Sequence, residues 1–83
     1  MVVTYEEETI LQNIAPEYKY IARDSNGDLN VYERKPHKSI EKGYWDDDTY
    51  YQINPFKHLF LWILWTDFEP YKISDILKGE IFG

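Results

Sequence analysis

A turn sequence between two strand-like stretches restricts the fold of this chain more than any other feature. Asp24-Ser25-Asn26-Gly27 consists of residues that favour turns, and it separates residues 17–24 from residues 28–34. Both flanking stretches are rich in the aromatic and β-branched residues that strands favour. The pattern therefore predicts an antiparallel β-hairpin, whose second strand ends at Pro36.

The hairpin admits two registers, which differ in the residues that face each other. A two-residue Asn-Gly loop would place two like charges, Lys19 and Arg34, across the ladder. A three-residue loop, built as a type I turn with Gly27 in the left-handed region, pairs aromatic, aliphatic and oppositely charged side chains instead. Its pairs are Tyr20 with Tyr32, Ile21 with Val31, and Lys19 with Glu33. Because each such pair contributes about 0.2–1 kcal/mol, we predict the three-residue loop.

Helix signals occur before this hairpin. Thr4 and Glu7 have the spacing of a capping box, in which each side chain satisfies a free backbone amide of the first turn. A short helix is expected to follow and to stop before Pro16. The three glutamates at its start suit the positive end of a helix, so we interpret them as a solvated first turn.

A second hairpin is predicted after Pro36. Residues 39–45 and 49–53 would pair through an acidic turn, Asp46-Asp47-Asp48, although Gly43 weakens the first strand. The three aspartates lack the ligand spacing, the central glycine and the terminal glutamate of a calcium-binding loop. We therefore read them as a turn and not as a metal site.

The C-terminal part of the chain offers short elements only. Residues 71–73 are expected to add an edge strand, and Ser74 is expected to cap a final helical turn over residues 75–78. Gly79 would terminate that turn in the left-handed conformation.

Residues 55–65 are the most apolar segment. Asn54-Pro55 is a helix-start pair, and the next large apolar residues follow the spacing of one helix face: Phe56, Leu59, Phe60, Ile63 and Leu64. We predict a central core helix, while a fully buried strand over residues 59–65 fits the same pattern. The expected fold is thus an α+β domain spanning residues 1–83: a small antiparallel sheet of two β-hairpins, an N-terminal helix and one apolar helix packed on the sheet.

Composition excludes several functional classes. A chain of 83 residues with no cysteine has neither disulfides nor thiolate metal ligands. Nine Lys and Arg against fifteen Asp and Glu give a net charge of −6, which makes nucleic acid an unfavourable partner. The first residues lack the features of a secretory signal, and no apolar run is long enough to cross a membrane. We expect a cytoplasmic protein without a membrane partner.

We find no pattern that indicates catalysis or a cofactor. The histidines, His37 and His58, stand alone, and glycine-rich phosphate loops, nucleophile elbows and metal-ligand spacings are all missing from the sequence. A basic cluster with neighbouring tyrosines could stack on single-stranded nucleic acid, but we interpret it as a charged loop balancing nearby aspartates. The cluster comprises Arg34, Lys35, His37, Lys38 and Lys42. We therefore expect a protein that is not an enzyme and that binds no metal or cofactor.

The surplus of large apolar groups in residues 55–65 carries the functional prediction. A domain this small has one core and cannot easily cover every face of such a segment. Exposed Trp and Leu side chains are what a protein partner or a second copy of the chain would bury. We predict a protein interface that contains Leu61, Trp62, Leu64 and Trp65.

An acidic inhibitor that imitates a nucleic-acid backbone, and so blocks a host nuclease or DNA-binding enzyme, is the alternative. It would need its carboxylates on a single face at phosphate-like spacing. The candidate carboxylates are Glu6, Glu7, Glu8, Asp46, Asp47 and Asp48.

Three stretches of the chain resemble a known group of proteins. Residues 18–29 read YKYIARDSNGDL, residues 32–36 read YERKP, and residues 65–71 read WTDFEPY. This arrangement resembles small uncharacterised proteins encoded by phages and prophages of Gram-positive bacteria, over roughly residues 17–73. The resemblance implies a phage or prophage origin and a bacterial cytoplasm, but no activity. We expect the partner of the predicted interface to be a host or phage protein. Phe68 departs from it, because an acidic residue is expected at that position.

Overall fold

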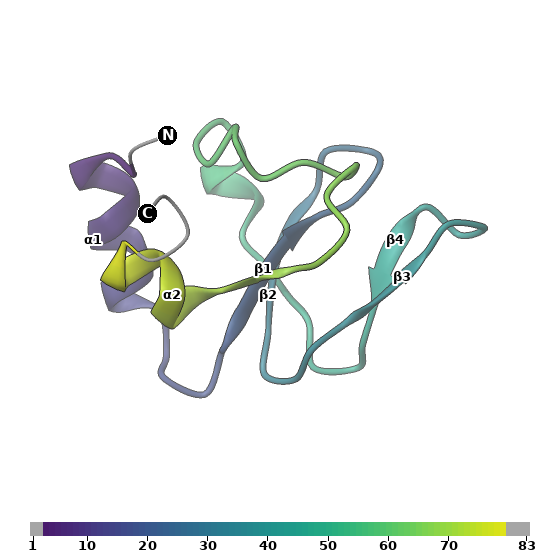
Figure 1. Ribbon diagram of the computed structural model, residues 1–83, viewed down its shortest axis with the longest axis horizontal. Helices are drawn as coiled ribbons and strands as arrows, with labels where there is room; N and C mark the ends of the chain where they lie inside the picture. Colours follow the sequence, from purple (N-terminus) through teal and green to yellow (C-terminus); the bar gives the residue numbers. More distant parts are fainter. Residues whose placement is uncertain (1–2, 80–83) are drawn as a thin grey trace.

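The computed structural model describes residues 3–79 and has an α+β fold. Two helices lie at one end of a central sheet, and a separate two-stranded hairpin lies at the other end (Figure 1). The elements in chain order are α1 (Tyr5–Asn13), β1 (Tyr20–Arg23), β2 (Leu29–Tyr32), β3 (His37–Ser39), β4 (Tyr44–Asp46), β5 (Tyr51–Gln52), the 3-10 helix η1 (Asn54–Phe56), β6 (Tyr71–Lys72) and α2 (Ile73–Lys78). No helix within the described range is long and apolar enough to span a membrane.

The first hairpin has the predicted register. Strand β1 pairs antiparallel with β2, with Tyr20 opposite Tyr32 and Ile21 opposite Val31. The loop is the expected three-residue one: the Asp24 amide donates to the carbonyl oxygen of Asp28 at 2.9 Å, and Gly27 has a φ of 94°. Aromatic and aliphatic pairing together with the turn residues therefore set this register, as predicted.

The central sheet differs from the predicted pair of hairpins. It has four strands in the order β5-β2-β1-β6, so β5 adds to the outer edge of β2. Residues 39–45 do not pair with residues 49–53. Instead β3 and β4 form their own hairpin, in which Gly43 has a φ of 79° and belongs to the connecting turn. The prediction treated Gly43 as a strand residue, which was wrong. It also made Asp46 to Asp48 a hairpin turn, but Asp46 is the last residue of β4, and only Asp47 and Asp48 lie in the connection from β4 to β5.

The expected edge strand near residue 71 is present as β6, which pairs with β1. The N-terminal capping box is confirmed, since the Glu7 amide donates to Thr4 Oγ1 and the Thr4 amide donates to Glu7 Oε1. Helix α2 begins earlier than expected. Its N-cap is Lys72 and not Ser74, because the chain passes directly from β6 into the helix, and Gly79 ends it in the left-handed conformation as predicted.

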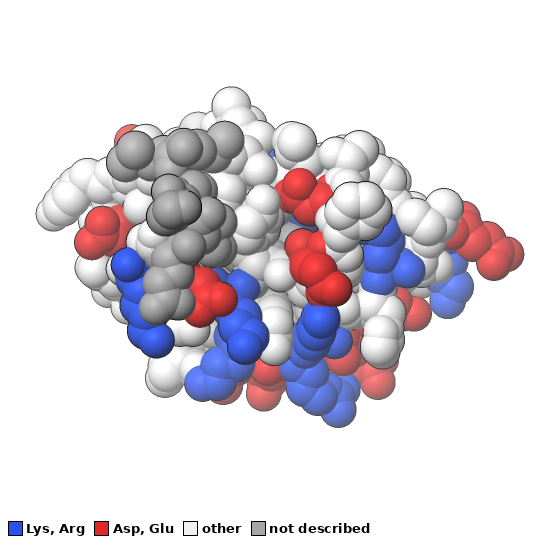
Figure 2. Space-filling view, viewed as in Figure 1, with Lys and Arg blue, Asp and Glu red and all other residues white. Residues whose placement is uncertain are grey.

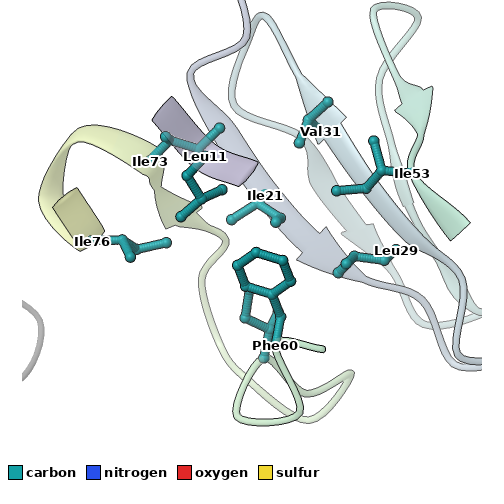
Figure 3. Packing of buried hydrophobic residues seen from close by; sticks show 9 residues of the cluster. Leu11, Ile21, Leu29, Val31, Ile53, Phe60, Ile73 and Ile76 are labelled. Atoms are coloured by element: carbon teal, nitrogen blue, oxygen red, sulfur yellow. The ribbon is translucent and has the colours of Figure 1, made fainter. Parts of the chain in front are cut away.

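The main core lies between the sheet and the two helices. Figure 3 shows the Phe60 ring beneath Ile21 of β1, with Leu11 of α1 and Ile76 of α2 on one side and Leu29 of β2 on the other. Phe60 is fully buried, as is Ile63 from the same segment. A second, smaller cluster on the opposite side of the hairpin contains Ala22, Tyr32 and Trp45.

The central apolar helix predicted for residues 55–65 does not exist, and the segment is not a buried strand either. Only η1 is helical, and the chain then continues through successive turns, which appear in green at the top of Figure 1. Each turn closes with an amide-to-carbonyl bond three residues back, such as Ile63 to Phe60 at 2.9 Å. The two buried residues of this segment, Phe60 and Ile63, are one such turn apart, and this interval resembles part of a helical spacing.

Candidate protein-binding surface

Residues 57–68, here called the apolar loop, are held in place by one arginine. The Arg23 guanidinium donates to the carbonyl oxygen of Ile63 through Nε at 2.9 Å and to that of Phe60 through Nη2 at 3.0 Å. Three further bonds, to the carbonyl oxygens of Gly27, Lys57 and Leu59, measure 2.9–3.1 Å. A guanidinium has five N–H donors, so its donor capacity is fully used. Arg23 thus replaces the hydrogen bonds that a helix would have provided to this backbone.

Glu7 fixes the same loop from the other side. Its Oε2 accepts a hydrogen bond from the Phe60 amide at 2.6 Å, and its Oε1 accepts one from Trp62 Nε1 at 3.4 Å. Burial alone would raise the pKa of Glu7, but the hydrogen bonds from Thr4, Phe60 and Trp62 outweigh burial and lower the pKa below its usual value. The capping glutamate of α1 therefore also accepts the hydrogen bond of the Phe60 backbone amide. Phe60 has a φ of 56°, in the left-handed region.

The structure divides the four predicted interface residues into two pairs. Leu61 and Leu64 are 69% and 48% exposed, which is unusual for large apolar side chains on a loop with a fixed backbone. Trp62 and Trp65 are half-buried and form part of the fold. The Trp62 ring meets the Tyr71 ring edge to face, with centroids 5.2 Å apart.

Trp65 closes the second core cluster. Its ring packs edge to face on Trp45 at a centroid distance of 6.4 Å, and Lys38 Nζ lies 4.6 Å from the centroid of the Trp65 ring. Lys38 also donates to the backbone carbonyl oxygens of Trp65 and Asp67. The Lys38 ammonium thus ties the β3–β4 hairpin to the apolar loop through cation–π contacts and hydrogen bonds.

Phe68 was not included in the predicted interface, yet it is 95% exposed and lies at the end of the apolar loop. The sequence carried a signal for it, since a bulky ring stands between Asp67 and Glu69 in an otherwise polar connection. An aromatic ring in such a position contributes nothing to the core and is typical of interface anchors. We add Phe68 to Leu61 and Leu64 as the exposed apolar groups of the loop.

The candidate carboxylates of the nucleic-acid mimic do not share one face. Glu6 and Glu8 belong to α1 at one end of the molecule, while Asp46 ends β4 at the other end and Asp47 and Asp48 follow it (Figure 1). Glu7 is buried and accepts hydrogen bonds from Phe60 and Thr4. The arrangement does not offer the continuous row of carboxylates that the mimic requires.

Of Tyr32 and Tyr44, the two tyrosines that neighbour the basic cluster, Tyr44 alone has an exposed ring. Tyr32 is fully buried, so its ring cannot receive a base. Three of the cations pair with carboxylates of the same chain: Lys35 with Glu69 at 2.7 Å, Arg34 with Asp47 at 3.4 Å and Lys42 with Asp46 at 3.8 Å. In Figure 2, blue and red groups alternate along the lower half of the visible face, whereas the upper edge over the apolar loop is largely uncharged. The cluster is a mixed-charge surface.

Within residues 3–79 no group of His, Asp and Glu side chains is arranged to hold a metal ion. Comparison with protein-family models, with curated proteins and with solved structures gave no match to this chain. The physical features of the apolar loop are therefore the basis for a functional proposal.

Proposed function

We propose that this protein is a non-enzymatic accessory protein of phage or prophage origin, which acts in the bacterial cytoplasm by binding a host or phage protein through its apolar loop. Leu61, Leu64 and Phe68 insert into the partner, and the rims of the Trp62 and Trp65 rings border the contact. A second copy of the chain is one form that this partner can take.

The supporting observation is exposed apolar side chains on a backbone that cannot collapse around them. Arg23 and Glu7 together bind the loop at Lys57, Leu59, Phe60 and Ile63. A loop fixed in this way loses little conformational entropy on binding, so more of the apolar contact energy remains as affinity. An isolated exposed Leu is ordinary, but three large apolar groups on one short fixed loop favour an interface.

A double variant, Leu61→Ser with Leu64→Ser, tests the self-association form of the proposal. Ile40→Ser is the matched control, because Ile40 is 74% exposed and lies in the β3–β4 turn away from the apolar loop. If two copies bind through the loop, light scattering shows a dimer for the unmodified protein and the control, and a monomer for the double variant.

If the unmodified protein is a monomer, the partner is a different protein. The same three proteins are then used as bait in host lysate at low and at high salt, and the captured protein is purified and tested for direct binding. Capture that survives high salt and is lost only with the double variant supports apolar docking. The proposal fails if no protein binds through Leu61 and Leu64, or if capture disappears at high salt, as carboxylate mimicry predicts.

A further inference from the structure

A cleft lies between the β1–β2 turn and the β3–β4 hairpin, away from the apolar loop. Its volume is about 540 Å³, within the range of small-ligand sites. Five aspartates and one lysine line it, so its field is strongly negative. Tyr44 and Tyr50 also line the cleft and are 38% and 62% exposed, and Lys42 Nζ already lies 5.8 Å from the centroid of the Tyr44 ring.

A buried carboxylate without a cationic partner lines this cleft. Asp24 is only 8% exposed, and its oxygens accept from the Trp45 amide at 2.9 Å and from Asn30 Nδ2 at 3.0 Å. No Lys, Arg or His among residues 3–79 forms an ion pair with it. The lysine at the cleft, Lys42, pairs with Asp46 instead, at 3.8 Å. A buried carboxylate is costly unless it is paired, so the site favours an added cation.

Asn30 supplies a second, independent indication of a ligand. Its side chain is buried, with 5% exposure of the residue, and its Oδ1 has no hydrogen-bond partner. Turning the amide over would place Oδ1 against the ionised Asp24 carboxylate and leave Nδ2 unpaired, so either orientation leaves one unsatisfied atom. An unsatisfied buried acceptor costs about 1–3 kcal/mol and is recovered when a donor reaches it.

We propose that this cleft binds the guanidinium group of an arginine side chain carried by a protein partner. Asp24 supplies the negative charge, Asn30 Oδ1 accepts a further N–H, and the Tyr44 and Tyr50 rings flank the planar group. A guanidinium fits better than an ammonium because its planar fork has several donors for neighbouring acceptors, stacks on aromatic faces and is weakly hydrated. This site is separate from the apolar loop, and its test does not depend on the function proposed above.

The experiment titrates the ¹⁵N-labelled protein with three blocked amino acids: acetyl-arginine amide, its uncharged isostere acetyl-citrulline amide, and acetyl-lysine amide blocked at the α-amine. The reporters are the Trp45 amide and the Asn30 side-chain amide. We expect the arginine compound to shift both signals saturably, the lysine compound to bind about tenfold more weakly through the loss of one charge-assisted hydrogen bond, and citrulline to have no effect.

Asp24→Asn should weaken arginine binding at least tenfold, and Glu17→Gln, which removes an equal charge from an exposed loop residue outside the cleft, should leave it unchanged. Tyr50→Ala changes an exposed side chain and should weaken binding about threefold without affecting the fold. Absence of arginine-induced shifts would overturn the proposal. Equal binding of lysine or citrulline, or equal losses in Asp24→Asn and Glu17→Gln, would do the same, because these results indicate either another ligand class or a non-specific field.

Discussion

Arg23 Nε lies 2.9 Å from the carbonyl oxygen of Ile63, and this bond joins a central strand to a loop forty residues further along the chain. The guanidinium is the common centre of the turns that make up the apolar loop. Arg23 makes four hydrogen bonds to the loop, whereas Glu7 and Lys38 each make two, so its substitution is the most informative single change.

Arg23→Lys should destabilise the protein although the positive charge is kept. A lysine ammonium has three donors on a single atom and cannot reach the five carbonyl oxygens that Arg23 serves. We expect a loss of about 3 kcal/mol or more in the free energy of unfolding, since hydrogen bonds to a charged group contribute about 1.5–3 kcal/mol each. Urea denaturation measures this loss.

Arg34→Lys is the matched control for Arg23→Lys, because the Arg34 side chain is 66% exposed and makes one surface ion pair. Its expected cost is less than about 1 kcal/mol. Equal losses in the free energy of unfolding for the two substitutions would show that the loop does not depend on the planar guanidinium group of Arg23.

Local signals predicted the parts of the fold that local interactions determine. The register of β1 and β2 follows from a turn and from side chains that are close in sequence, and the capping box at Thr4 and Glu7 spans four residues. Both could be read from the sequence, because the residues that stabilise them are neighbours in the chain.

Elements that depend on distant partners were predicted wrongly. Strand β5 joins β2, where the Leu29 amide also donates to Asn54 Oδ1, and nothing in residues 49–53 indicates that edge. The apolar loop follows a helical spacing, but Arg23 and Glu7 supply its hydrogen bonds from other parts of the chain. The surplus of apolar groups indicated that Leu61 and Leu64 are exposed, whereas the periodicity placed Leu64 on the core face and gave the wrong conformation.

Glu7→Gln should lower stability at neutral pH and reduce the acid sensitivity of the protein. The pKa of Glu7 in the folded state is below its usual value of 4.5, so its ionised form stabilises the fold above that value and the contribution is lost as the pH falls through the folded pKa. A glutamine keeps one acceptor oxygen but presents an amide to either Thr4 or Phe60. We expect a cost of about 1–3 kcal/mol at neutral pH.

The measurement for Glu7→Gln is urea denaturation at neutral pH and again below pH 4.5. The gap between this variant and the unmodified protein should narrow in acid. Glu6→Gln, on the exposed side of the same helical turn, should follow the unmodified protein at both pH values. A gap that stays constant with pH would rule out the ionised Glu7 carboxylate as the source of stability.

Asp24→Asn should keep or raise stability, whereas Asp24→Ala should lower it. Burial and the neighbouring Asp28 raise the pKa of Asp24 above 3.8 despite its hydrogen bonds from Trp45 and Asn30. The protonated Asp24 carboxyl group therefore stabilises the fold fully below the pKa of the unfolded state, and this stabilisation is lost as the pH rises through the pKa of the folded state. An asparagine at position 24 keeps an acceptor oxygen for the Trp45 backbone amide. Its side-chain NH2 group can donate to Asn30 Oδ1 once the Asn30 side-chain amide has rotated by a half turn.

Alanine at position 24 leaves the Trp45 amide and Asn30 Nδ2 unpaired, which should cost about 2–4 kcal/mol. Thermal and urea unfolding at neutral pH compare the two variants. If Asp24→Asn lost as much stability as Asp24→Ala, the fold would require the charge of the Asp24 carboxylate. The missing cationic partner of Asp24 would then need an explanation other than an unfilled ligand site.

Gly43→Ala should be more destabilising than Gly27→Ala although both glycines have positive φ values, 79° and 94°. A methyl group at position 27 would meet nothing within 4 Å, so only the backbone cost of about 1–2 kcal/mol applies there. At position 43 the added carbon would lie 2.6 Å from Ser25 Oγ, which already donates to the Gly43 carbonyl oxygen at 2.7 Å. The contact joins the β1–β2 turn to the β3–β4 turn, and the serine must move for the alanine to fit.

A double-mutant cycle that combines Gly43→Ala with Ser25→Ala checks this contact. The two losses in the free energy of unfolding should be less than additive by on the order of 1 kcal/mol, whereas strict additivity would show that the two turns do not meet at these side chains.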